Sequence, residues 1–392
     1  MLKGIKVIDL SRNLAAPFCT MILGDMGAEV IKIELPGVGD EARGFSPIID
    51  GESGYFMSIN RNKKGMTLNL KDERGRTILR ELLGNADVMV DSFRPGVLDR
   101  LGFSYEKMKV LNPRLICASI SGFGHTGPYR EKSAYDLVVQ GYGGIMSVTG
   151  QQDSGPTRVG ISLGDLAAGL YLTIGIEGAL VARNRTGEGD FIDVAMLDCQ
   201  IALLENVIMR YCATGKVPGP VGNRHPSITP FESFQTKDGF VIVCAGNQRL
   251  WEDFCTVISR RDLIKDVRFM NNDKRTENHH VLKPIIEEVM KTKQTSEWLS
   301  ILETAGIPCG PINNVSCLME DEQVRSREMI VSCNHPQAGI VKMPGFPIKS
   351  AKYKLPQSYE PSPSLGQHNR EILQTLGLDD SAIEAMKKDK VI

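Results

Sequence analysis

The repeated alternation of short apolar runs with helical patterns limits this chain to few folds. Residues 5–10 (IKVIDL) and 29–34 (EVIKIE) have the composition of short buried strands, and the pattern of residues 17–26 predicts a helix between them. Strand, helix and strand within about thirty residues form a βαβ unit, whose crossover is right-handed. We therefore expect the chain to begin with two parallel strands.

The same alternation continues through the first half of the chain. Further strands are predicted at 66–70, 87–90, 115–120 and 190–194, and further helices at 73–83, 134–141, 165–183 and 195–211. This order is typical of the α/β class, with a Rossmann-like, mainly parallel sheet and helices on both faces. Ligands of such sheets bind beyond the carboxyl ends of the strands, here near residues 11–17, 35–39, 92–96 and 121–128.

A change in composition separates a second domain. Residues 215–230 contain four prolines and three glycines, which indicates a hinge. We assign 1–214 to a large Rossmann-like domain that binds the ligand and 225–325 to a smaller inserted α/β domain. That domain contains a strand at 240–245 and helices near 249–258, 279–291 and 295–305. Residues 330–392 are expected to return to the large domain.

Charge and cysteine usage limit the partners and the compartment. The 392 residues include 46 basic and 47 acidic side chains, a net charge of -1 that favours neither nucleic acid nor an anionic membrane as partner. Nine cysteines without a C-x-x-C pair indicate free thiols in a reducing cytoplasm. The first residues lead directly into a strand pattern, without a signal peptide. The longest apolar helix contains Glu177 and several glycines, so we do not expect it to span a membrane.

One carboxylate stands at the start of that long apolar helix. An extended run ends at Gly164, and Asp165 is expected at the N-terminal cap, where free N–H groups and the positive helix end favour an ionised carboxylate. A charged carboxylate at the edge of an apolar region is a candidate nucleophile. An ordinary helix cap explains these residues equally well, and this segment alone does not decide between the two.

Familiar catalytic motifs are weak or missing. Residues 122–127 (GFGHTG) match the dinucleotide-binding pattern G-x-G-x-x-G, but they follow the fifth predicted strand, and Pro128 interrupts the helix that should follow. An NAD-dependent oxidoreductase therefore stays open as an alternative. The sequence has no P-loop and no G-x-S-x-G elbow, and its six histidines show no ligand spacing, so we expect no metal site.

Basic and aromatic residues recur where the predicted strands end or begin. They occur in 60–64 (NRNKK), in 92–96 (SFRPG) with Arg100 one turn later, and in 132–136 (KSAYD). Each group alone is typical of a solvated surface. Together they indicate a site for a phosphate-bearing ligand at the carboxyl edge of the sheet.

Ordered matches along almost the whole chain resemble one known family, the class III CoA-transferases, which also includes α-methylacyl-CoA racemases. The matching segments are GIKVIDL at 4–10, GDMGAEVIKIE at 24–34, PGVGD at 36–40, NRNKK at 60–64, SFRPG at 92–96, NPRLI at 112–116, SGFGHTGP at 121–128, YDL at 135–137, GDLAAGL at 164–170, TGEG at 186–189 and LGQH at 365–368.

The resemblance implies CoA transfer between an acyl-CoA, such as succinyl-CoA, and a free carboxylic acid. Asp165 takes the position of the family nucleophile, which forms an aspartyl anhydride and then an aspartyl-CoA thioester. CoA and acyl-CoA would be substrates, with no tightly bound cofactor. Oxyanion donors are expected at Gly143–Gly144 and near Gly246. The positions that correspond to the family's CoA contacts are Ala15, Leu68, Asn69, Lys71, Phe93, Arg94, Arg100, Lys132 and Tyr135.

Three departures from the family pattern qualify the resemblance. Leu35 stands where relatives often have a CoA-binding arginine. The glycine-rich loop of formyl-CoA:oxalate enzymes is also missing, and its absence favours larger acids such as succinate or glutarate over oxalate. Racemases have a histidine at the position of Tyr135, so transfer is favoured over racemisation, which needs a base on each face of the α-carbon. The resemblance further implies an interlocked homodimer.

Overall fold

A six-stranded parallel sheet forms the centre of the first half of the chain. The computed structural model describes residues 1–353 and 358–392. The strand order is β5-β2-β1-β6-β7-β8, and every neighbouring pair is parallel. The strands are β1 (Lys6–Asp9), β2 (Glu29–Glu34), β5 (Lys63–Thr67), β6 (Val88–Asp91), β7 (Ile116–Ser121) and β8 (Phe191–Ala195). The predicted α/β class with a large parallel sheet is confirmed.

The order of the strands creates a switch point between β1 and β6. From β1 the chain adds β2 and β5 on one side of the sheet, and it then adds β6, β7 and β8 on the other. The connections on either side of this point diverge, so a crevice opens at the carboxyl ends of β1 and β6. The loops that begin at Leu10 and Ser92 therefore lie side by side although about eighty positions separate them.

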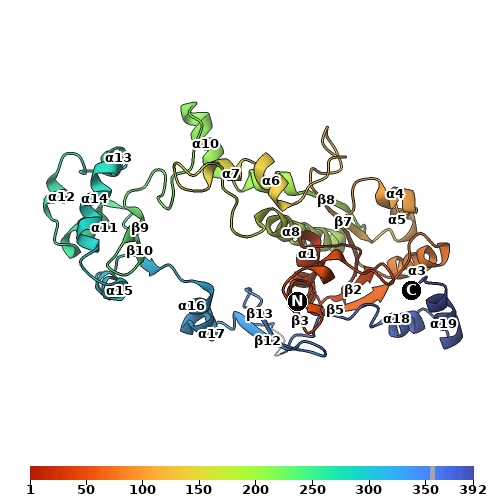
Figure 1. The fold of residues 1–392 in the computed structure, drawn as a ribbon. Helices are drawn as coiled ribbons and strands as arrows, with labels where there is room; N and C mark the ends of the chain where they lie inside the picture. Colours follow the sequence, from red (N-terminus) through yellow and green to blue (C-terminus); the bar gives the residue numbers. More distant parts are fainter. Residues whose placement is uncertain (354–357) are drawn as a thin grey trace. The chain divides into compact units, whose positions relative to one another are not determined.

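Helices cover both faces of the sheet. On one face α1 (Ala15–Asp25) and α8 (Leu163–Thr186) pack against each other (Figure 1). Together with α9 (Met196–Ala202) they enclose one apolar core. Helices α3 (Glu73–Gly84), α5 (Tyr105–Leu111), α18 (Asn369–Thr375) and α19 (Asp380–Lys388) enclose a second core on the opposite face. Both faces are thus buried, which explains the continuous apolar runs in the strands.

A missing side chain allows the close packing of α1 and α8. A Cβ atom on Gly169 would lie 2.6 Å from the carbonyl oxygen of Ala15. By length and composition α8 could also cross a membrane, but core helices of soluble proteins pass the same test. The packing against α1 explains the apolar residues on the buried face of α8.

Two predicted elements differ from the structure. Strand β5 begins at Lys63, three residues before the prediction, because the buried Lys63 ammonium pairs with Asp9 at 3.1 Å and so occupies an interior strand position despite its charge. The single helix predicted at 195–211 is two helices, α9 and α10 (Glu205–Thr214). The apolar pattern continues across the break at 203–204, so periodicity does not reveal it.

The chain divides into two compact units. The first contains Met1–Ile145, Arg158–Thr214 and Gln323–Ile392, and the second contains Met146–Thr157 and Gly215–Glu322. The sequence assigned 146–157 to the large domain, whereas here this segment lies with the second unit. The N–H of Gly222 donates to the Gly150 carbonyl oxygen at 2.9 Å, which joins the segment to that unit.

The second unit has its own sheet and core. Antiparallel strands β9 (Phe231–Gln235), β10 (Phe240–Cys244) and β11 (Cys309–Pro311) pack with α11 (Gln248–Val257), α14 (His279–Met290) and α15 (Thr295–Thr304) around a core that includes Trp251 and Trp298. The remaining elements of both units are η1 (Glu41–Gly44), β3 (Ile48–Ile49), β4 (Glu52–Ser53), α2 (Gly54–Ile59), α4 (Val97–Leu101), α6 (Asp136–Tyr142), α7 (Ile145–Val148), α12 (Asp262–Lys265), α13 (Asn272–Glu277), α16 (Val315–Glu320), α17 (Glu322–Ser326), β12 (Ile330–His335) and β13 (Gly339–Pro344).

Candidate active site

A cavity of about 420 Å³ opens in the first unit at the carboxyl edge of the sheet. Its walls come from the loops after β1, β6 and β7 and from the first turn of α8. Six of the residues that the sequence singled out line it together: Asp165, Ala15, Phe93, Arg94, Lys132 and Tyr135. The other lining residues are Arg12, Asn13, Leu14, Glu41, Ser92, Pro95, Val97, Ile120, Ser121, Gly122, Arg130, Ser133, Ala134 and Met196.

Asp165 lies inside the first turn of α8 rather than at its cap. The helix begins at Leu163 with Ser162 as the N-cap, so Asp165 is the third helical residue. Burial, and after it the nearby carboxylate of Asp136, raises the pKa of Asp165 to about 7. The sequence predicted that the helix end would favour the ionised form, which is the opposite direction. Desolvation and a like charge therefore outweigh the helix dipole here.

A hydrogen-bonded clamp fixes the start of α8. The Asp136 carboxylate accepts the N–H of Gly164 through Oδ1 at 2.8 Å and the Nε2–H of Gln140 through Oδ2 at 2.8 Å. The other end of the Gln140 amide, Oε1, accepts the N–H of Val159 at 2.9 Å. Asp136 thus both positions Asp165 and raises its pKa. Sequence reasoning missed this role, although the Tyr135–Asp136 pair is part of a family segment.

Gly164 is needed at this position because the neighbouring helix lies close. A Cβ atom there would lie 2.7 Å from Cγ2 of Val139 on α6. Real Cβ contacts do not occur at this distance, so a larger residue would push α8 away from α6. The absence of a side chain beside Asp165 therefore serves the packing of the two helices.

Positive charge dominates the cavity wall. Four cationic side chains, Arg12, Arg94, Arg130 and Lys132, line it together with the acidic Glu41 and Asp165. The Lys132 ammonium lies 3.6 Å from the ring centroid of Tyr129, a cation–π contact that orients it. Sequence reasoning missed Arg12, a single arginine after the first strand, and Arg130, which lies two residues before the segment 132–136. The wall suits an anionic, phosphate-bearing ligand.

Buried ion pairs hold the loop after β1. The Lys32 ammonium donates to the carbonyl oxygen of Ser11 at 2.8 Å and pairs with Asp40 at 2.9 Å, where both side chains are fully buried. The Asp40 carboxylate in turn accepts the N–H of Asn13 at 3.0 Å. Burial of an ion pair costs its hydration and is tolerated only where hydrogen bonds compensate. These bonds therefore constrain the geometry of the loop.

Four predicted CoA contacts lie outside the described lining of this cavity. Leu68 is buried in the core beneath the sheet, and Asn69, Lys71 and Arg100 lie at the same carboxyl edge. The proposed oxyanion donors Gly143 and Gly144 are not among the lining residues of this cavity either. Their N–H groups donate to the carbonyl oxygens of Val139 and Gly141 at the end of α6.

The dinucleotide pattern lacks its structural context. Residues 122–127 follow β7, the fifth strand of the sheet in chain order, and the next helix in the described chain, α6, begins only at Asp136. A pyrophosphate site of the dinucleotide type needs the glycine loop to lead directly into a helix N-terminus. The segment therefore does not form a dinucleotide-binding turn.

Comparison with known proteins settles the family. A model of CoA-transferase family III matches residues 2–369. The chain belongs to this family. It is a class III CoA-transferase, and the predicted assignment is confirmed.

Individual relatives of this transferase are similar over almost their full length. Acetyl-CoA:oxalate CoA-transferase of Acetobacter aceti is 44% identical over 365 residues, which cover 93% of this chain and 92% of the relative. Succinyl-CoA:glutarate CoA-transferase of Mus musculus is 39% identical over 393 residues, covering 100% and 90%. The crystal structure of a CAIB/BAIF family protein from Brucella suis aligns with a TM-score of 0.85 and 38% identity, covering 95% of this chain and 98% of that one.

The first of these relatives bears on the predicted substrate range. The sequence departures favoured larger acids over oxalate, yet a relative named for oxalate is 44% identical to this transferase. Relatives named for oxalate and for glutarate are both similar to this chain, so the preference for larger acids stays a prediction.

Proposed function

We propose that Asp165 is the nucleophile of this transferase and that the cavity around it binds the acyl-CoA. The observation that carries the proposal is that this half-buried carboxylate lines the same cavity as four cationic side chains, at the switch point of the sheet. CoA carries several phosphate charges, and arginine and lysine are the side chains that bind phosphate. Burial keeps Asp165 poorly hydrated, which increases the reactivity of its ionised form.

The first half of the reaction moves CoA onto the protein. A carboxylate oxygen of Asp165 attacks the thioester carbonyl of the donor, the C–S bond breaks, and the CoA thiolate leaves with the bonding electrons. The thiolate then attacks the Asp165 carbonyl of the mixed anhydride, and the C–O bond breaks to release the donor acid as a carboxylate. An aspartyl-CoA thioester remains, and no proton or redox partner is required.

The second half repeats these steps with the acceptor. The acceptor carboxylate attacks the aspartyl thioester and expels the thiolate, which gives a second anhydride. The thiolate attacks the acceptor carbonyl, so the new acyl-CoA forms and the Asp165 carboxylate is restored. Each intermediate is an activated acyl group that water would destroy, which is why the reacting carboxylate must lie in a largely buried site.

The acceptor and donor are short acids in this proposal. Relatives are named for oxalate, with acetyl-CoA as donor, and for glutarate, with succinyl-CoA as donor. Both acceptors are dicarboxylates, so the end of the acid that does not react carries a second negative charge. The cationic wall of the cavity offers partners for that charge.

Chemical trapping tests the nucleophile. The transferase is incubated with succinyl-CoA and no acceptor, then treated with hydroxylamine, digested and sequenced by fragment-ion mass spectrometry. Conversion of Asp165 to its hydroxamate is expected, because hydroxylamine cleaves the aspartyl thioester. Glu177, a partly buried carboxylate on the same helix, is the matched control and should stay unmodified. Unmodified Asp165 in an enzyme that still turns over would refute the proposal.

We further propose that the working enzyme is an interlocked homodimer. None of the ten residues of α10, all of which are described, is buried. Its large apolar side chains are exposed as well, Met209 by 64% and Tyr211 by 51%. Along α8, Ile174 and Val181 are each 62% exposed. An isolated helix of this length is unstable in water, and continuous apolar exposure is typical of an interface. A second copy of the chain would cover these helices.

Mass and subunit exchange test the dimer. Light scattering should give twice the chain mass of 43.1 kDa. Mixed tagged and untagged enzymes should exchange subunits only after unfolding, because threaded chains cannot separate while folded. Met209→Glu should reduce the dimer fraction, whereas Val110→Glu, at an 85% exposed position of α5, should not. A folded, active monomer would refute this proposal.

The thiols support a cytoplasmic location within the same proposal. All nine cysteines, each within the described residues, are free, and five of them are buried. A protein without disulfides is typical of a reducing compartment. Fractionation of the source cells with an antibody against the chain would test it.

A further inference from the structure

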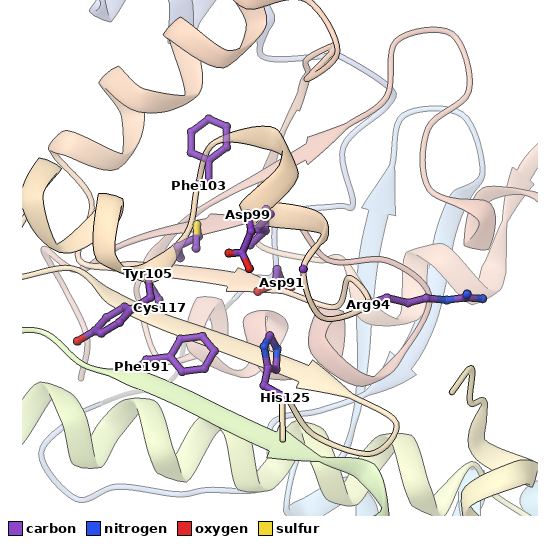
Figure 2. Close-up of a pocket in the computed structure, with 11 residues that line it drawn as sticks. Asp91, Arg94, Asp99, Phe103, Tyr105, Cys117, His125 and Phe191 are labelled. Atoms are coloured by element: carbon purple, nitrogen blue, oxygen red, sulfur yellow. The ribbon is translucent and has the colours of Figure 1, made fainter. Parts of the chain in front are cut away.

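A second cavity, of about 190 Å³, lies beneath the turn that carries Phe93 and Arg94. Its floor is formed by Met89, Cys117 and Phe191 from three neighbouring strands, and its roof by residues of α4 and of the segment that leads into α5. Figure 2 shows Asp91, Asp99 and His125 in this cavity, whereas Arg94 extends away from the group. The same arginine lines the cavity of Asp165, so one turn borders both cavities.

Asp91 connects the second cavity to this turn. It is the last residue of β6 and is 3% exposed. Its Oδ1 accepts the N–H of Phe93 at 3.0 Å. The bond closes a short side-chain-to-backbone turn directly after the strand, and this turn sets the direction in which residues 92–96 leave the sheet.

Two further side chains continue the chain of hydrogen bonds. Ser119 is the register partner of Asp91 on β7, and its hydroxyl acts to lower the pKa of the Asp91 carboxylate. The Ser119 Oγ lies 3.0 Å from Nε2 of His125.

The loop that carries His125 is itself fixed. The His125 N–H donates to Oδ2 of Asp193 at 2.8 Å, and its ring packs against the ring of Phe191 with centroids 5.1 Å apart. The imidazole therefore has a defined position relative to β8. The chain of contacts runs from this anchored loop through Ser119 and Asp91 to the N–H of Phe93.

We propose that Asp91, Ser119 and His125 are positioning residues for CoA binding, and that the turn at 92–96 holds its CoA-binding geometry best when Asp91 is ionised. The inference rests on the proposed function, because it takes Phe93 and Arg94 as contacts of CoA. An ionised carboxylate accepts hydrogen bonds that are roughly twice as strong as those of a neutral acceptor. Loss of the Asp91 charge therefore loosens the Phe93 N–H and the turn that depends on it.

The groups around Asp91 place the loss of its charge near neutral pH. Burial raises the pKa of Asp91 to about 7, and the carboxylates of Asp193 and Asp99 act in the same direction, against the hydrogen bonds from Phe93 and Ser119. The other ionisable side chains that line this cavity near it are Tyr105, Cys117 and His125, whereas Arg94 points away. Because the pKa is raised, the ionised form is lost as pH falls through about 7, and CoA affinity falls with it.

Direct binding in an Asp165→Asn background isolates the effect. This substitution removes the other carboxylate with a pKa near 7. Calorimetry then gives the dissociation constant of free CoA between about pH 6 and about pH 8 for Asp165→Asn and for Asp165→Asn with Asp91→Asn. Titration of the CoA phosphate in this range is common to both proteins and cancels in the comparison.

The expected result is a difference in slope. Acidification should weaken CoA binding by about three- to tenfold more in the protein that retains Asp91, the worth of one hydrogen bond. Asp99→Asn, the matched control in the same cavity, should keep the effect and move its midpoint to lower pH, because a like charge is removed. Equal pH dependence with and without Asp91 would overturn the inference.

Folding and function have separate readouts. If Asp91→Asn does not fold, Ser119→Ala in the same Asp165→Asn background serves instead, and the midpoint of its pH dependence should move to higher pH, because the hydroxyl lowers the pKa of Asp91. A Ser119→Ala profile identical to that of the parent overturns the inference. Failure of Asp165→Asn to bind CoA at any pH would refute the proposed CoA site itself, and the positioning role with it.

Discussion

Removal of the Asp136 charge should shift the pH dependence of this transferase. The proposed nucleophile Asp165 must be ionised to attack, so kcat/KM should fall as pH decreases through its pKa of about 7. Asp136→Asn keeps an oxygen that can accept the Gly164 N–H, and it removes the like charge. The acid limb of log kcat/KM should therefore move to lower pH.

The structure sets the size of this shift. The Asp165 pKa is raised from 3.8 to about 7, a difference of about 3 pH units, and Asp136 is the smaller of its two causes after burial. Its removal therefore lowers the pKa by at most about half of that, or 1.5 pH units. At about pH 6 the ionised fraction would rise from about a tenth to as much as three quarters, a gain of up to about eightfold in relative kcat/KM.

Initial rates of CoA transfer, followed by chromatography of the CoA thioesters from about pH 5 to about pH 8.5, measure the limb directly. Its position is read relative to each enzyme's own plateau at high pH. A lower plateau, caused by disturbance of Gln140, therefore does not hide the shift. If the limb of Asp136→Asn coincides with that of the wild-type enzyme, the electrostatic coupling of the two carboxylates is refuted.

Three further outcomes follow from the structure. Gly169→Ala should destabilise the fold by about 1–3 kcal/mol in denaturant unfolding, because its Cβ would lie 2.6 Å from the Ala15 carbonyl oxygen. Lys132→Ala should raise KM for acyl-CoA by about five- to tenfold with little change in kcat. Arg249→Ala, whose side chain is 93% exposed, should change neither constant. In deuterated water the α-carbon of a 2-methylacyl-CoA should take up no deuterium, since uptake would indicate racemisation.

Much of the site was visible in the sequence as parts rather than as a whole. Phe93, Arg94, Lys132 and Tyr135 were singled out because basic and aromatic residues follow predicted strands, and each lines the cavity of Asp165. Arg12 could not be found in this way, because a single arginine after a strand carries no pattern. Its place in the wall depends on β1 lying beside β6, which is a property of the sheet.

The ionisation of Asp165 shows why local reasoning was not enough. Its place in the first turn of a helix predicts a stabilised charge, and that local effect is real. The opposing effects come from burial and from Asp136, 29 positions earlier in the chain. Neither is recorded in the residues around Asp165.

The sequence by itself determined the α/β class, the alternation of strands and helices, and the carboxylate at the start of α8, because periodicity and helix starts are set by neighbouring residues. Only the tertiary structure decided the strand order, the cationic cavity around Asp165 and the hydrogen bonds of Asp91 and Asp136. These depend on burial and on contacts between distant segments, which exist only once the chain has folded.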